Sequence, residues 1–196
     1  MMRLLQQIPL YWKWQSTKYS YMMIDENIPD SAKILDVGSG YGLLAHYLGR
    51  KPMRKIWAVD ISKKRIQYSH IKKSPNVHFI CQDATKIKSK DFDVIIMSDF
   101  LHHLSLKKQN EVIKNARKQL KRDGLILIKE VQKDYLAPGF WFLYCFDLFF
   151  NIFKPLFYQT KQFYTSKIKE NGFKIVKCDD DHRSVWGEFL LIGQKL

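Results

Sequence analysis

The chain has 196 residues, 46% of them hydrophobic and 14% aromatic, which suits one folded domain with a sizeable core and excludes a disordered chain. Its three cysteines lie far apart and form no C-x-x-C pair, which argues against a disulfide framework or a zinc site and favours a reducing cytoplasm. The net charge of +14 fits either a polyanionic partner or a lysine-rich solvated surface. We favour the second, because runs such as Lys63-Lys64-Arg65 flank apolar stretches as solvent-facing helix residues do.

An aromatic segment comes first, and we expect residues 1–30 to form a helical cap. Its aromatic side chains include Tyr11, Trp12, Trp14, Tyr19 and Tyr21. Gln6 and Gln7 interrupt the apolar start, and no small-residue cleavage site follows, so no signal peptide is expected. We therefore expect a cytoplasmic protein, with peripheral contact with an anionic membrane as an open alternative.

Short apolar runs then alternate with helical patterns along the chain. The runs do not alternate with polar residues, which is typical of strands buried on both faces of a parallel sheet. The predicted strands are residues 33–37, 55–59, 77–81, 92–97 and 125–131. Residues 106–120 carry Val112, Ile113, Ala116 and Leu120 on one stripe with lysines opposite, which predicts an amphipathic helix.

The C-terminal end departs from this alternation. Residues 173–178 and 184–192 look like two successive strands with only 179–183 between them, too short a link for a parallel crossover. The pair should be antiparallel. The sequence therefore predicts a single α/β domain over residues 1–196, with a doubly wound, seven-stranded, mostly parallel sheet whose last strand is antiparallel.

A glycine-rich turn follows the first predicted strand. The stretch ILDVGSGYGLLA, residues 34–45, places Asp36 before Gly38, Gly40 and Gly42 in a D-x-G-x-G-x-G pattern. A dinucleotide fingerprint would need Gly or Ala where Leu43 stands. The next strand is followed by Asp60, an acid placed to accept hydrogen bonds from ribose hydroxyls. The pattern predicts a nucleoside-containing cofactor.

Five segments in order resemble the motifs of the class I S-adenosylmethionine-dependent methyltransferases. They are LDVGSGYG, AVDIS, CQDATKI, FDVIIMSDFLHHL and LKRDGLILIKEV. The resemblance is strong over residues 33–131 and weaker over 163–194, where the hairpin fits the family's antiparallel last strand. It implies S-adenosyl-L-methionine as the cofactor.

The resemblance also implies the residues that hold this cofactor. Gly38, Ser39, Gly40 and Gly42 would lie against its methionine and ribose parts, Asp36 near its amino group and Asp60 at its ribose hydroxyls. Ile61 would pack on the adenine, Asp83 would accept from the adenine amino group beside Ala84, and Ser98 completes the set. Alternatively, Asp83 only caps a short helix through Thr85.

Two histidines follow the fourth predicted strand on the ligand side. His102 and His103 are the candidates for a general base, needed if the acceptor must lose a proton. Alternatively, one of them is packed at the start of a helix. Glu130, at the carboxyl end of the fifth strand, could orient a base or a substrate. We expect no metal, because Asp99 alone near His102 does not make a cluster of carboxylates.

A second aromatic segment follows the fifth strand. Residues 132–162 are expected to form a helical insertion that acts as a lid, although core filling, a membrane contact or a dimer contact are alternatives. Together with the N-terminal segment it would cover a small apolar or lipid-like acceptor, methylated at oxygen. The expected substrate contacts are Tyr19, His102, Glu130, Phe140 and Trp141.

The rival acceptor is RNA or protein, supported by the charge of +14. Against it, the turn after the fourth strand reads Ser98-Asp99-Phe100-Leu101, without the prolines typical of enzymes that methylate base amines or glutamine amides. A binding module without catalysis is disfavoured by the intact glycine run and the ribose acid. Nucleic acid is therefore the less favoured partner, and the sequence leaves the oligomeric state open.

Overall fold

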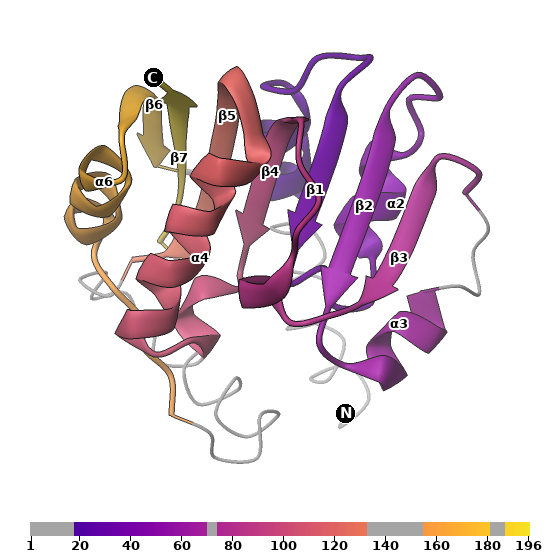
Figure 1. Cartoon of the computed structure of the whole chain (residues 1–196), viewed down its shortest axis with the longest axis horizontal. Helices are drawn as coiled ribbons and strands as arrows, with labels where there is room; N and C mark the ends of the chain where they lie inside the picture. The colour runs from indigo at the N-terminus through magenta and orange to yellow at the C-terminus, as the bar shows by residue number, and fades with distance from the viewer. Residues whose placement is uncertain (1–17, 70–73, 133–154, 181–186) are drawn as a thin grey trace, which may run out of the picture.

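A seven-stranded sheet forms the centre of the molecule (Figure 1). The computed structural model describes residues 18–69, 74–132, 155–180 and 187–196. Strand order is β3-β2-β1-β4-β5-β7-β6, and β1 to β5 are parallel while β7 runs antiparallel to both β5 and β6. The strands are β1 Lys33–Val37, β2 Lys55–Asp60, β3 Val77–Cys81, β4 Phe92–Ser98, β5 Leu120–Val131, β6 Phe173–Asp180 and β7 Glu188–Lys195.

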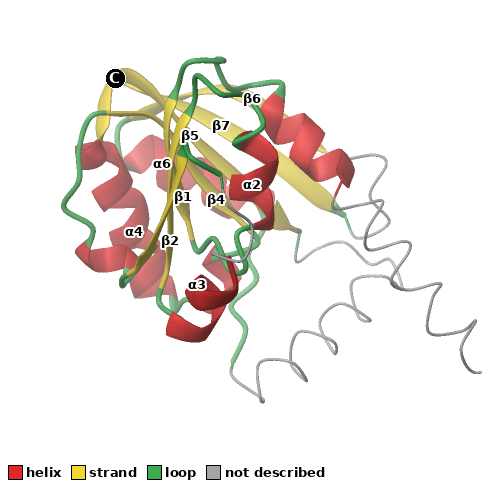
Figure 2. Cartoon of the chain, turned by 90° about the vertical axis from the view of Figure 1, so that its right-hand side faces the viewer, coloured by secondary structure: helices red, strands yellow, loops and turns green. Residues whose placement is uncertain are grey.

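Helices cover both faces of this sheet. They are α2 Leu43–Leu48, α3 Lys63–Ser69, α4 Leu106–Gln119 and α6 Lys161–Glu170, with 3-10 turns η1 Ala84–Lys86 and η2 Leu101–His103, and residues 18–25 are also helical. Figure 2 shows α4 and α2 on opposite sides of the sheet. One core cluster joins the sheet to α4 and α6, and the other joins it to α2 and residues 18–25.

The predicted fold class and strand order along the chain are confirmed. β1 and β3 have the predicted bounds, and the stripe on α4 is buried as expected. The fifth strand begins at Leu120 instead of residue 125, because Leu120 already pairs with Phe92 before a register shift. The last two strands are antiparallel as predicted, but β7 continues to Lys195, three residues beyond the expected end.

The structure describes only part of each of the two aromatic segments. Residues 18–25 are helical, which agrees with a cap over 1–30, whereas residues 1–17 lie outside the described residues. Most of the expected insertion, residues 133–154, also lies outside them, and residues 155–160 have no regular secondary structure. The lid stays a prediction.

A buried arginine fixes the end of the N-terminal helical stretch. The Arg54 side chain is fully buried before β2, and its guanidinium donates to the carbonyls of Ile28 at 2.7 Å and Pro29 at 3.1 Å. It also pairs with the carboxylate of Asp25. A buried guanidinium needs this full set of partners, so the chain after the helix is held firmly to the sheet.

Gly42 begins α2 in the left-handed conformation, at φ 75°. A Cβ there would lie 2.4 Å from the Phe79 ring on β3. Gly42→Ala should therefore lower the free energy of unfolding by about 2–4 kcal/mol, through backbone strain and overpacking, as measured by urea denaturation.

Gly40→Ala is the matched control. Gly40 is also left-handed, at φ 56°, but a Cβ there would meet nothing within 4 Å. Its cost should be the backbone strain alone, about 1–2 kcal/mol. Equal losses in the two variants would contradict the packing role assigned to Gly42.

Candidate cofactor and acceptor site

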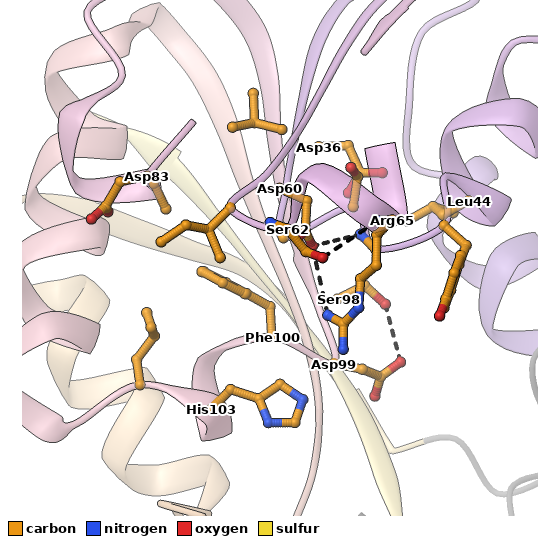
Figure 3. A pocket seen from close by; sticks show the side chains of 18 of the residues that line it. Asp36, Leu44, Asp60, Ser62, Arg65, Asp83, Ser98, Asp99, Phe100 and His103 are labelled. Atoms are coloured by element: carbon orange, nitrogen blue, oxygen red, sulfur yellow. Dashed lines mark hydrogen bonds and ion pairs between the residues drawn. The ribbon is translucent and has the colours of Figure 1, made fainter. Parts of the chain in front are cut away.

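A cavity of about 630 Å³ lies at the carboxyl ends of the parallel strands. Its walls come from the turns after β1, β2, β3 and β4, which include residues 38–41, 60–62, 82–85 and 98–100. The strand order reverses between β1 and β4, the place where doubly wound sheets bind ligands. Figure 3 shows Asp36 and Asp60 near each other, Asp83 farther along the wall, and His103 beyond Phe100.

The glycine turn forms the wall after β1. The amides of Gly38 and Ser39 donate to the carbonyl of Val59 at 2.8 and 3.0 Å, which ties the turn to β2. A Cβ on Gly38 would overlap the Phe100 ring, whereas one on Gly40 would enter open space at the cavity. Gly42 is not among the residues that line the cavity, and a glycine is required there for packing on Phe79. Its contact with the cofactor stays a prediction.

Two acids lie beside this turn. Asp60 accepts from the amides of Gly40 at 2.9 Å and Ser62 at 2.8 Å, and its carboxylate lies 3.8 Å from the Arg65 guanidinium. Asp36 is buried, and burial together with the nearby charge of Asp60 raises the pKa of its carboxyl to about 7. Within the described residues, Asp36 Oδ2 and Ser39 Oγ are buried without a hydrogen-bond partner. A ligand with positively charged N–H donors would satisfy this carboxylate.

The position of Asp83 is compatible with both of its predicted roles, as a helix cap and as a residue of the cofactor site. Its Oδ1 accepts from the amide and hydroxyl of Thr85 at 2.9 and 2.8 Å, which caps η1 and lowers the pKa of the carboxyl. Asp83 and Ala84 also line the cavity, with Ser98 and Ile61. Ile61 is 72% exposed, so an apolar surface is available at this wall for a flat ring.

The two histidines are placed differently. His103 lines the cavity, whereas His102 is buried behind it and stacks on Tyr158 with ring centroids 4.4 Å apart. Nδ1 of His102 lies 2.6 Å from Glu130 Oε2, and Glu130 Oε1 accepts from the amides of Phe100 and Leu101 at 3.0 and 2.6 Å. Glu130 therefore holds the turn that carries His103.

None of the predicted substrate contacts that the structure describes lines the cavity. Glu130 and His102 are buried and do not line it. Their side chains contact each other, and Glu130 also accepts from two backbone amides at the start of η2. Tyr19 does not line it either; Tyr21, two residues later on the helix, does. Phe140 and Trp141 lie outside the described residues.

Sequence reasoning missed an ionic cluster at the cavity, in which a buried lysine joins two carboxylates. Asp99 lines the cavity with φ 50°, and both of its carboxylate oxygens lie 2.9 Å from Lys129 Nζ. Lys129 also donates to Glu188 on β7. Burial alone would lower the pKa of Lys129, but the charges of Asp99 and Glu188 outweigh it and raise that pKa above its usual range. The available signal was the Lys-Glu pair at the end of an otherwise apolar strand.

Comparison with known proteins identifies the family. A model of the methyltransferase domain matches residues 34–124, which contain the glycine turn and β1 to β4. Residues 34–124 are a methyltransferase domain, of the class I S-adenosylmethionine-dependent type that the motifs predict. Over 114 residues this methyltransferase is 29% identical to a phosphoethanolamine N-methyltransferase of Plasmodium falciparum. That match covers 56% of the chain but only 42% of the relative.

Solved structures share its fold. A methyltransferase from Methanosarcina mazei has a TM-score of 0.70 at 18% identity, covering 89% of this chain and 97% of that one. Magnesium protoporphyrin IX methyltransferase from Synechocystis, with bound S-adenosylhomocysteine, has a TM-score of 0.69 at 17% identity over 95% and 84%. The [4+2]-cyclase SpnF is also similar, with a TM-score of 0.74 at 18% identity over 92% and 82%, so the fold alone does not define the reaction.

The cofactor of this methyltransferase is S-adenosylmethionine. The site fits it in three respects: an unpaired buried carboxylate at Asp36, open space above Gly40, and an acid at the end of β2. None of these features is a phosphate-binding arrangement. In the part of the chain that the structure describes, no group of three or more His, Cys, Asp or Glu could hold a metal ion.

Cofactor binding should depend on the protonation of Asp36. In the free protein this carboxyl is neutral below a pH of about 7, and a ligand ammonium favours its ionised form. Affinity for S-adenosylhomocysteine should therefore fall as pH decreases below 7, approaching tenfold per unit. Calorimetry between pH 5.5 and 7.5 tests this. Asp36→Asn should bind weakly without that slope, and a flat profile in the unaltered protein would contradict the assignment.

Asp60→Asn should weaken S-adenosylmethionine binding about 10- to 100-fold, because hydrogen bonds to a charged group contribute about 1.5–3 kcal/mol. Calorimetry measures the loss, and circular dichroism checks the fold. Asp93→Asn is the control, since Asp93 accepts from the amide of Lys33 at the amino end of β1, away from the cavity. Unchanged affinity in Asp60→Asn would remove Asp60 from the cofactor site.

Proposed function

We propose that the protein transfers a methyl group from S-adenosylmethionine to a hydroxyl oxygen of a small apolar or lipid-like acceptor. The observation that carries this proposal is the position of His103 in the same cavity as the glycine turn, with the buried His102–Glu130 pair directly behind it. A base is needed at that place only if the acceptor must lose a proton, as a hydroxyl must.

The cofactor supplies an electrophilic methyl group on a sulfonium, so the protein's main task is to align the acceptor with it. His103 takes the acceptor proton. Its turn is held by Glu130 through two backbone amides, and by the 3.1 Å bond from the amide of His103 to the carbonyl of Phe100. The 2.6 Å contact with Glu130 favours a proton on Nδ1 of His102, which fixes the orientation of that ring beside His103.

The wall around His103 supports a largely apolar acceptor. Phe100, Leu104 and Pro155 line the cavity there. Pro155 belongs to the chain that returns after the aromatic segment, and the next residues dock on η2: the amide of Phe157 donates to the carbonyl of His102 at 2.7 Å. The return point of that segment is thus next to the proposed base, which agrees with the predicted lid.

A small amine is the second candidate acceptor. The Plasmodium relative is named a phosphoethanolamine N-methyltransferase, and Asp99 and Lys108 are charged residues in the cavity wall. A carboxylate there would suit an ammonium, and a lysine would suit an anionic group. Methylation of RNA or protein remains the rival that the basic surface supports.

No helix among the described residues is both long and apolar enough to cross a membrane.

His103→Asn should lower kcat about 10²–10⁴-fold on a hydroxyl acceptor, the range for loss of a general base, with little change in the Kd of S-adenosylhomocysteine. His78→Asn is the control, because His78 is an exposed histidine on β3 that does not line the cavity. Full turnover in His103→Asn would show that alignment alone suffices and would end the assignment of a base.

The acceptor class is tested by incubation with methyl-labelled cofactor. Lipid extracts, hydroxylated small molecules, phosphoethanolamine and RNA serve as parallel acceptors, and mass spectrometry locates the label. Label on an oxygen of a lipophilic product is the expected result. Label on an amine would favour the second candidate, and salt-sensitive labelling of RNA would favour the rival.

A further inference from the structure

A cluster of three charged side chains reaches from the cavity wall into the protein: Asp99 is exposed at the wall, and Lys129 and Glu188 are buried beside it. Lys129 is 2% exposed and Glu188 is 6% exposed, and they lie on β5 and β7 at the carboxyl end of the parallel strands. The single ammonium of Lys129 contacts both Glu188 and Asp99. Removing the ammonium would leave the Glu188 carboxylate buried without its charge partner, which is strongly unfavourable, and would leave Asp99 without the two bonds that hold its side chain. The positions of Asp99 and Glu188 therefore depend on each other through Lys129.

The cavity end of this cluster is Asp99. Its backbone is left-handed at φ 50°, a conformation that costs a non-glycine residue free energy and persists only where surrounding contacts impose it. The contacts that hold it here include the two bonds from Lys129 Nζ, the bond from the Asp99 amide to the Lys129 carbonyl at 2.9 Å, and a longer bond from the Ser98 hydroxyl at 3.3 Å. One residue of β5 thus fixes both the backbone and the side chain of Asp99.

The other end of the cluster is the N-terminal helical stretch. Ser20 is buried, and its hydroxyl donates to Glu188 Oε2 at 3.0 Å. The next residue, Tyr21, lines the cavity. Arg54 holds the far end of the same stretch through Asp25 and the carbonyl of Ile28. The end nearest the cavity is therefore positioned by a different set of contacts, in which Glu188 takes part.

We propose that Lys129 is a positioning residue that couples the docking of residues 18–25 to the conformation of Asp99 in the cavity wall. One chain of hydrogen bonds and ion pairs runs along the face of the sheet that residues 18–25 cover. Its members, in order, are Ser20, Glu188, Lys129 and Asp99. When the helix is docked, Glu188 holds the ammonium in line with Asp99; when the helix separates, both walls of the cavity loosen together. This inference concerns the cofactor-binding protein and does not depend on the identity of the acceptor or on His103.

Amide hydrogen exchange on the whole chain tests this coupling without an acceptor. The amide of Asp99, bonded to the Lys129 carbonyl, reports one end, and the amide of Glu26, bonded to the Met22 carbonyl at 3.0 Å, reports the helix. Ser20→Ala removes the hydrogen bond from its hydroxyl to Glu188 and does not alter Asp99 itself. It should speed exchange at both amides about fivefold, the effect of one lost hydrogen bond on local opening. Amides of β2 should not change, which separates local opening from global unfolding.

Lys129→Met should speed exchange at the Asp99 and Glu26 amides by more than Ser20→Ala does, and Lys129→Arg should restore part of the protection because it keeps the charge. Lys121→Met is the matched control: Lys121 lies on the same strand and pairs with Asp93 at 2.7 Å on the surface. It should leave both amides unchanged. If Lys129→Met fails to fold, Ser20→Ala and Lys129→Arg still decide the question.

Ligand binding gives a second readout. S-adenosylhomocysteine should slow exchange at both amides in the unaltered protein, and by reciprocity Ser20→Ala should weaken its binding. S-adenosylmethionine carries one more positive charge than S-adenosylhomocysteine. If Lys129→Met acts by displacing the cavity wall at Asp99, it should lower the affinity for both ligands by a similar factor. If it acts only by removing a positive charge, it should favour the binding of S-adenosylmethionine over S-adenosylhomocysteine. The proposal is overturned if Ser20→Ala affects Glu26 alone, or if the two ligands diverge in Lys129→Met.

Discussion

The walls of the cavity depend on two buried charges that are neighbours in sequence. Side chains alternate along a strand, so Lys129 and Glu130 point to opposite faces of the sheet from the end of β5. Glu130 holds the turn with His103 on the face covered by α4, and Lys129 holds Asp99 on the face covered by residues 18–25. Neither charge would be tolerated there without its partners, so the end of this strand and both walls form one unit.

The cofactor end of the cavity is organised by backbone geometry instead. The turn after β1 is tied to β2 through the Val59 carbonyl, and Asp60 in turn holds the amide of Gly40. The result is an acidic recess in a protein whose net charge is +14. The local field in the recess is negative, whereas the field of the whole surface is positive. The recess therefore attracts a cationic cofactor and repels the phosphate groups of nucleic acid.

Most of the fold and the cofactor end of the cavity could be predicted, because short stretches of sequence determine them. Mostly apolar runs of five residues mark β1 and β3, and the spacing of Asp36, Gly40 and Asp60 marks the turns after β1 and β2. The acceptor end could not be predicted in the same way. Which of Tyr19 and Tyr21 faces the cavity depends on the rotation of a helix, and the partners of Glu130 depend on contacts 28–30 residues away. Long-range pairing of this kind leaves no short motif.

The chain leaves β5 and returns to the sheet region at nearly the same place. Val131 at the end of the strand packs with Leu156 and Tyr158, and Tyr158 stacks on His102. The entry and exit of the intervening segment are thus fastened to each other, and lengthening a closed loop changes its closure entropy only slowly. Evolution can therefore exchange this segment, in length or composition, without disturbing strand register or the glycine turn. The architecture thus separates changes in this segment from the turns that form the cofactor end of the cavity.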